Sequence, residues 1–195
     1  AHETYITEET DWNPEKPHSD YAISKYGAEM EVWRAHQEGL NVIIVNPGVI
    51  LGPIPKTKNK KQGSAELYTK VANGLPFYTL GSTGFIVVDD VVKIIYELMK
   101  SNIKNERFTL IADNIIFKDI LDTIATALKV KKPSIHAKPL FMNLLWMIDG
   151  VFSTVFFQKR SITKATAKAS YSKNLYSNEK IKTALGTVFT DVHQY

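Results

Sequence analysis

The feature that most constrains this chain is a helical pattern that leads directly into an apolar run rich in β-branched residues. Ser19 or Asp20 is expected to cap a helix, in which apolar side chains recur at helical spacing from Asp20 to Glu38 until Gly39 ends the pattern. The run from Asn41 to Asn46 follows, and Pro47 closes it. Its composition predicts a strand that is buried on both faces. Because a helix that feeds a buried strand is the repeating unit of parallel sheets, we predict an α/β fold.

The alternation of strand and helix recurs further along the chain. Residues 85–88 are expected to form a second buried strand, and Asp89 is expected to cap a helix that runs to about Ser101. Gly81 to Gly84 is predicted to be a turn before that strand. The remaining predicted elements are a helix over 64–73, strands over 77–80 and 107–112, and helices over 117–128 and 178–185.

The composition excludes several kinds of chemistry. None of the 195 residues is Cys, so the chain has no disulfide, no catalytic thiolate and no Cys-ligated zinc. The lack of Cys agrees with a reducing compartment, and we expect a cytoplasmic protein. No GxGxxG, Walker, HExxH or GxSxG pattern occurs, so the sequence indicates neither a Gly-rich phosphate loop nor a metal or serine hydrolase. We predict no metal site.

Two segments have compositions that also occur in membrane-binding or nucleic-acid-binding proteins. The stretch from Pro139 to Phe157 is the most apolar part of the chain, but it contains Asp149. We expect a helix packed on its own protein, and an interfacial membrane helix or a partner-binding helix is the alternative. The lysines from Lys56 to Lys61 predict a solvated loop, with binding of nucleic acid or anionic membrane as the alternative. Because no aromatic residue is interleaved with them, we expect neither nucleic-acid binding nor membrane contact.

A tyrosine and a lysine four residues apart on a helix place a phenol and an ammonium group on one face. The ammonium stabilises the phenolate, so such a tyrosine can exchange protons with a substrate hydroxyl or carbonyl while a nicotinamide takes or gives a hydride. We expect Tyr96 to be a core or boundary residue and Tyr176 to precede its helix. Tyr21 lies near the start of a helix that leads directly into a buried strand, which makes it the candidate, and an ordinary tyrosine on the helix surface is the alternative. The three pairs with this spacing are Tyr21 and Lys25, Tyr96 and Lys100, and Tyr176 and Lys180.

Three motifs around the first pair follow one another in a specific order. They are Tyr21-Ala-Ile-Ser-Lys25-Tyr-Gly-Ala-Glu29, Asn41-Val-Ile-Ile-Val-Asn-Pro-Gly-Val-Ile-Leu-Gly-Pro53 and Gly84-Phe-Ile-Val-Val-Asp-Asp-Val91. With them the chain resembles the extended short-chain dehydrogenase/reductase superfamily, and within it the NAD-dependent epimerase/dehydratase and dihydroflavonol-reductase-like group. The resemblance implies the C-terminal part of a doubly wound Rossmann-type parallel sheet with a smaller α+β substrate-binding domain. The implied Rossmann part covers 1–53, and the part over 54–195 is mainly substrate-binding, with 85–112 returning to the Rossmann sheet.

The resemblance also implies roles for individual residues. Tyr21 would be the general acid and base, and Lys25 would hold the nicotinamide ribose and stabilise the phenolate. Both would contact the cofactor. At the carboxyl end of a strand, the backbone would line the nicotinamide pocket at Pro47, Gly48 and Val49. Three further side chains would neighbour the substrate or, alternatively, close the core: Asn46, Leu51 and Phe85.

Two parts of the family's pattern have no counterpart in this sequence. The dinucleotide fingerprint and the catalytic Ser or Thr lie more than twenty residues before the tyrosine, and Tyr21 has only twenty residues ahead of it. The chain therefore looks like the C-terminal half of such an enzyme, and we expect this half alone to be inactive. The whole enzyme would use NAD or NADP and act on a hydroxyl or carbonyl of a small molecule, such as a nucleotide sugar or a hydroxylated ring compound.

Two further expectations concern partners. A non-catalytic family member that serves as a cofactor sensor or a partner-binding scaffold is the alternative to an enzyme. The resemblance also implies a homodimer formed through the helix from Asp20 to Glu38.

Overall fold

A computed structural model of the protein describes residues 3–15, 18–53, 63–138 and 169–194. The helices are α1 (Asp20–Gln37), α2 (Ser64–Ala72), α3 (Val88–Lys100), α4 (Phe117–Ala127) and α7 (Glu179–Leu185). The strands are β1 (Glu3–Ile6), β2 (Ile43–Pro47), β3 (Val49–Leu51), β4 (Phe77–Tyr78), β5 (Ser82–Val87), β6 (Glu106–Leu110), β7 (Asp113–Ile116), β8 (Ile135–His136) and β9 (Lys173–Tyr176). The chain divides into unit 1, with 1–4, 53–83 and 114–175, and unit 2, with 5–52, 84–113 and 176–195.

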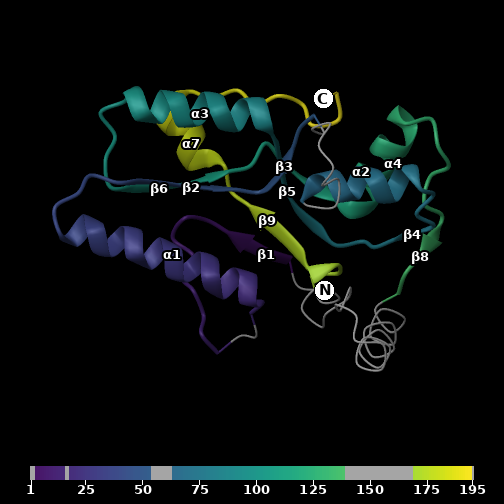
Figure 1. The fold of residues 1–195 in the computed structure, drawn as a ribbon, viewed down its shortest axis with the longest axis horizontal. Coiled ribbons are helices and arrows are strands. Elements are labelled where there is room, and N and C mark those ends of the chain that lie inside the picture. Colours follow the sequence, from purple (N-terminus) through teal and green to yellow (C-terminus); the bar gives the residue numbers. More distant parts are fainter. Residues whose placement is uncertain (1–2, 16–17, 54–62, 139–168, 195) are drawn as a thin grey trace. The chain divides into compact units, whose positions relative to one another are not determined.

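Unit 2 is built on two pairs of parallel strands. β2 pairs with β6, from Ile43 opposite Glu106 to Pro47 opposite Leu110. β3 pairs with β5 in the same parallel sense. Helix α1 lies on one side of the β2–β6 pair, and α3 and α7 lie on the other (Figure 1). Helices on both faces of parallel strands confirm the predicted α/β class.

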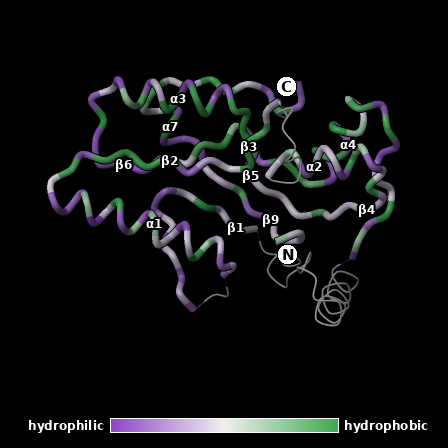
Figure 2. The backbone as a smooth tube through the Cα atoms, viewed as in Figure 1, coloured by the Kyte–Doolittle hydropathy of each residue, from purple (hydrophilic) through white to green (hydrophobic). Residues whose placement is uncertain are grey.

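The core of unit 2 lies where α3 and α7 meet the strands. Its buried side chains come from β5, α3, β6 and α7 and are Ile86, Val91, Ile94, Leu98, Phe108, Leu110 and Ile181. Figure 2 shows hydrophobic stretches along β2 and β6, whereas α1 is mostly hydrophilic. The prediction that β2 is buried on both faces is wrong. Residues 43–46 are only half-buried, because α1, on the other side, has no buried residue to pack against them.

The residues predicted to begin and end α1 are confirmed, but the cap and the turn predicted before α3 are not. The Oγ of Ser19 accepts a hydrogen bond from the Ala22 amide at 3.2 Å, which caps α1. Asp89 is not the cap of α3, because the helix begins one residue earlier and Val87 takes the N-cap position. Asp89 lies instead in the first turn, where a carboxylate complements the helix dipole. The predicted turn over 81–84 is also wrong, since β5 already begins at Ser82.

Gly48 is the single residue between β2 and β3, and no larger residue fits there. Its amide donates to the carbonyl oxygen of Leu110 at 3.1 Å. A Cβ added to Gly48 would lie 2.4 Å from the carbonyl oxygen of Gly84 and 2.4 Å from Cδ1 of Ile111. The Pro-Gly sequence after the apolar run therefore lets the chain pass from β2 into β3 in close contact with β5.

Unit 1 combines two helices with short strands. α2 packs against α4, and α4 also contacts β4. β4 pairs in parallel with β8, where Phe77 lies opposite Ile135. β9 pairs with the beginning of β5, where Ser82 lies opposite Lys173. The predicted helices near 64–73 and 117–128 are thus confirmed with small changes of their ends.

Two predictions concern residues outside the described ranges. These are the apolar helix from Pro139 to Phe157 and the solvated loop from Lys56 to Lys61. Within the described ranges, no helix combines the length and the apolar character that crossing a membrane requires.

Candidate active site

The candidate acid–base pair lies in the first two turns of α1. The Tyr21 side chain is highly exposed, at 72%. The Nζ of Lys25 lies 5.6 Å from the centroid of the Tyr21 ring. The phenol and the ammonium group therefore share one accessible face of the helix, as their spacing predicted.

The other two Tyr–Lys pairs are placed differently. Tyr96 is 57% exposed on α3, so its prediction as a core or boundary residue is wrong, and the Nζ of Lys100 lies 4.1 Å from its ring centroid. Tyr176 belongs to β9, whereas Lys180 belongs to α7 and forms an ion pair with Glu106 at 2.7 Å. The third pair therefore has no common helix face, and only the first two pairs combine a phenol and an ammonium group on one helix.

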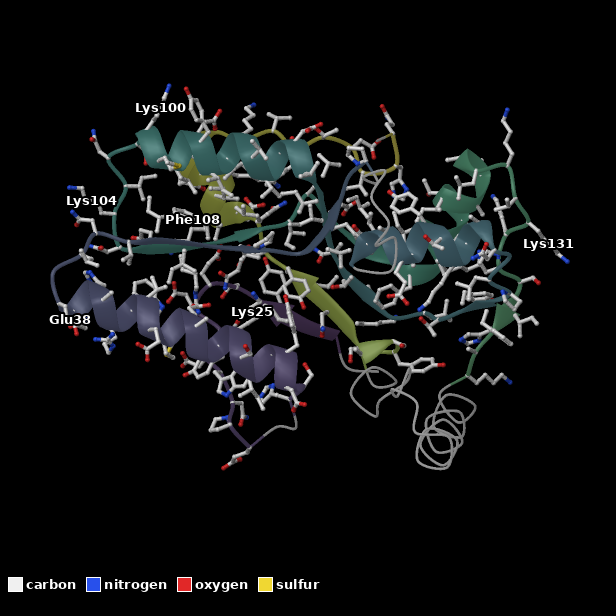
Figure 3. The ribbon with its side chains drawn as sticks, in the orientation of Figure 1. Lys25, Glu38, Lys100, Lys104, Phe108 and Lys131 are labelled. Carbon is white, nitrogen blue, oxygen red and sulfur yellow. The ribbon has the colours of Figure 1, made fainter. Side chains whose placement is uncertain are left out.

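The direction of α1 brings its beginning toward the carboxyl end of β2. The helix runs antiparallel to β2 (Figure 1), and Figure 3 shows Lys25 toward the helix start and Glu38 at the opposite end. Pro47 ends β2 in an exposed position next to Leu110 of β6, and Gly48 and Val49 follow it. In open α/β sheets, ligands bind outside the carboxyl ends of the strands. The helix and the strand end therefore present their candidate residues to the same side of unit 2.

The three residues predicted as substrate neighbours are not equivalent. Leu51 and Phe85 are 2% and 1% exposed, so both belong to the core, which is the alternative role that the sequence left open for them. Asn46 is half-buried, and its Nδ2 donates to Oε2 of Glu29 on α1 at 3.1 Å. Among these three, only Asn46 connects a strand to the helix that carries Tyr21.

Two residues at this site were missed by the sequence analysis. Glu29 follows Lys25 by four residues, and its Oε1 forms an ion pair with Nη1 of Arg107 at 2.8 Å. Arg107 comes from β6, and its Nη2 also donates to the backbone carbonyl of Glu8. The spacing from Tyr21 through Lys25 to Glu29 placed all three on one helix face, but no local pattern could show that Arg107 faces them.

A cavity of about 450 Å³ separates part of α1 from β6. Aromatic side chains of α1 and of the segment before it line the cavity together with charged residues of β6: Trp12, Tyr26, Trp33, Glu106 and Arg107. The Trp12 and Tyr26 rings stack with their centroids 4.5 Å apart. Three apolar residues of α1, Tyr26, Met30 and Trp33, therefore border this cavity, and neither Tyr21 nor Lys25 lines it.

Parallel strands covered by helices on both faces define an α/β protein of the class that binds its ligands at the carboxyl ends of the strands. Residues 1–110 match the model of the NAD dependent epimerase/dehydratase family. Because this match covers more than half of the chain, the protein belongs to that family.

Comparisons with individual proteins agree with this assignment. The chain is 24% identical over 150 residues to sterol demethylase protein B of Methylococcus capsulatus, covering 76% of this chain and 45% of that protein. The crystal structure of gox2253 has a TM-score of 0.77 at 23% identity, covering 98% of this chain and 58% of that one. UDP-glucose 4-epimerase of Thermus thermophilus, solved in complex with NAD, has a TM-score of 0.61 at 14% identity, covering 98% and 60%. These two structures show the likeness of fold, and the chain spans about half the length of the proteins it matches.

The family is NAD-dependent, and the residues on the open side of unit 2 fit one end of that cofactor. An exposed phenol and an exposed ammonium group are donors suited to ribose hydroxyls, and Pro47 offers an apolar surface beside them at the strand end. The pyrophosphate end would require a Gly-rich turn between a strand and a helix, and the sequence contains no such pattern. The side chains present therefore offer hydrogen-bond donors for a ribose but no phosphate-binding turn.

Proposed function

We propose that this chain supplies the acid–base pair and the nicotinamide-facing strand end of an oxidoreductase, epimerase or dehydratase that uses NAD or NADP. Its substrate would be a small molecule with a hydroxyl or carbonyl group, such as a nucleotide sugar or a hydroxylated ring compound. The observation that carries the proposal is the exposed pair of Tyr21 and Lys25 at the end of α1 that faces the carboxyl end of β2.

The proposed roles follow from the chemistry of the two side chains. The Tyr21 hydroxyl donates its proton to a substrate carbonyl oxygen during reduction, and the phenolate accepts the proton of a substrate hydroxyl during oxidation. Lys25 donates hydrogen bonds to the ribose and stabilises the phenolate with its charge. The nicotinamide, when bound, supplies or accepts the hydride.

The strand end would form the wall behind the nicotinamide. The amide of Gly48 is already used by the carbonyl oxygen of Leu110, so we propose that Pro47 and Val49 form the contact surface while Gly48 fixes the path of the backbone. The substrate-selecting part would be unit 1, which holds most of the residues between β3 and β5. A homodimer through α1 is also proposed, because that helix has no buried residue and exposes Ile23 and Val32.

A charge substitution tests the cofactor site directly. In the full-length protein, Lys25→Met should weaken NAD or NADP binding about 10- to 100-fold, since a hydrogen bond from a charged group contributes roughly 1.5–3 kcal/mol. Lys100→Met is the matched control, because Lys100 also lies beside a tyrosine ring on a helix. Calorimetric titration with NAD and with NADP measures the affinity of both variants. Equal affinities of the Lys25→Met variant and the unmodified protein would contradict the proposed site.

A further inference from the structure

We propose that Glu29 is a positioning residue that ties α1 to the carboxyl end of β2 and thereby holds Tyr21 at the nicotinamide. The inference rests on the proposed function, because it concerns how the same acid–base pair is held. Glu29 itself would touch neither substrate nor cofactor.

The contacts of Glu29 join three separate parts of unit 2. Its Oε1 accepts from Nη1 of Arg107 on β6 at 2.8 Å, and its Oε2 accepts from Nδ2 of Asn46 on β2 at 3.1 Å. Arg107 in turn donates to the backbone carbonyl of Glu8. The Glu29 side chain is only 14% exposed, so both carboxylate oxygens are satisfied by strand residues in a largely dry environment. One side chain thus connects the helix with both strands of the β2–β6 pair.

Within this chain, α1 contributes no residue to the buried core. The helix has no buried residue among those described, and Tyr26, Met30 and Trp33 border the cavity shared with β6. A helix without an interlocked apolar face can turn about its axis or slide at small cost. Within this chain, the Glu29 contacts therefore fix the orientation of α1 relative to β2 and β6.

The position of Glu29 couples the two halves of the candidate site. Asn46 directly precedes Pro47, so the strand residue that Glu29 binds is adjacent to the proposed nicotinamide wall. Tyr21 lies two turns, or about 12 Å, from Glu29 along the helix. Small rotations at Glu29 therefore displace the phenol, and misplacements of about 1 Å are enough to cost roughly 100-fold in rate.

Fluorine NMR of the full-length protein tests this role without the use of turnover. 3-Fluorotyrosine is placed at position 21, and its resonance is followed during titration with NAD and, separately, with NADP. We expect a shift on binding in the unmodified protein, a loss of about half of that shift or more in Glu29→Ala, and an intermediate value in Glu29→Gln, which keeps the volume of the side chain. Glu31→Ala is the matched control, because Glu31 pairs with Arg34 on the exposed face of the same helix.

The shift at saturation separates positioning from stability. It is a property of the folded complex, so partial unfolding lowers the intensity of the resonance without moving it. Glu29→Gln provides the second variant if Glu29→Ala does not fold, since it leaves a hydrogen-bonding group beside Arg107 and Asn46. Saturated shifts in the Glu29 variants equal to that of the unmodified protein would overturn the inference alone. No response of the unmodified protein to either dinucleotide would overturn the proposed function, and the inference with it.

Discussion

Replacing either of two glycines by alanine probes the tightest contact in unit 2. The nearest atoms to a Cβ on Gly84 would all belong to the Ile111 side chain, with Cδ1 at 2.3 Å and Cγ2 at 2.8 Å. A Cβ on Gly48 would meet the same Cδ1 and also the backbone carbonyl oxygen of Gly84, both at 2.4 Å. Ordinary contacts between such atoms are about 3.5 Å, so each substitution requires a displacement of about 1 Å. For Gly48→Ala, part of that displacement must come from the backbone.

A second substitution at Ile111 should therefore restore more of the lost stability to Gly84→Ala than to Gly48→Ala. Overpacking of a core typically costs about 1–3 kcal/mol, and we expect Gly48→Ala near 3 and Gly84→Ala near 2 kcal/mol. Ile111→Ala removes the three atoms nearest to the new Cβ of Gly84→Ala, so this pair should show a favourable coupling of about 1 kcal/mol or more. Ile111→Ala leaves the backbone carbonyl of Gly84 in place. The coupling energy between Ile111→Ala and Gly48→Ala should therefore be smaller.

Urea unfolding of the three single variants, the two double variants and the unmodified protein gives these energies. With a slope of roughly 2 kcal/mol per molar, a loss of 3 kcal/mol lowers the midpoint by about 1.5 M. Gly27→Ala is the control in α1, where a Cβ would meet nothing within 4 Å, and it should raise stability by about 0.5–1 kcal/mol. If Gly48→Ala unfolds at the midpoint of the unmodified protein, the close approach of β3 and β5 described above is incorrect.

Three other predictions concern the surface of α1, the C-terminal segment and alkaline pH. Ile23→Glu should dissociate the proposed homodimer in sedimentation experiments, because Ile23 is exposed on α1; an unchanged dimer would exclude this face. The carboxylate of Asp90 accepts from the amide and the hydroxyl of Thr190 at 2.8 and 3.0 Å, so Asp90→Ala should speed hydrogen exchange of the Thr190 amide about 10- to 100-fold. Burial raises the pKa of Tyr68 above 10, so the folded state keeps the proton longer than the unfolded chain and stability should fall as pH rises above about 10. Tyr68→Phe should reduce the loss of stability above about pH 10. If the slope of stability against pH is unchanged in this variant, groups other than Tyr68 cause the loss.

The elements that sequence patterns predicted well are those with local signals. The Ser19 cap, the stop at Gly39 and the apolar run before Pro47 all lie within a few residues of the ends they mark. β9 had no such signal, because it forms by pairing with β1 and with Ser82 at the start of β5, which lie about ninety positions or more earlier in the chain. The expected turn before Phe85 failed for the same reason, since that partner extends β5 backward to Ser82.

In the candidate site, too, residues marked by a local pattern could be predicted, whereas contacts between distant parts of the chain could not. Tyr21 and Lys25 could be chosen by their helix face and by the motifs around them, and the structure places both on an exposed face. Glu29 could have been noticed by its spacing, but its partner Arg107 is 78 residues away and comes from a different strand. Leu51 and Phe85 carry no local mark that separates a substrate neighbour from a core residue, and only their burial does so.

Turnover of a Tyr21→Phe variant tests the central claim most directly. Full-length protein would be assayed with NAD and NADP against nucleotide sugars and hydroxylated ring compounds, and the variant compared on whichever substrate reacts. General acid–base catalysis contributes about 10²- to 10⁴-fold, so the variant should lose that much in kcat. Its dinucleotide affinity should fall by only about 2- to 10-fold, because it loses one neutral hydrogen bond to the ribose. Tyr96→Phe, the matched tyrosine beside Lys100, should keep full activity. If Tyr21→Phe turns over as fast as the unmodified protein, the assignment of Tyr21 as the acid and base is wrong.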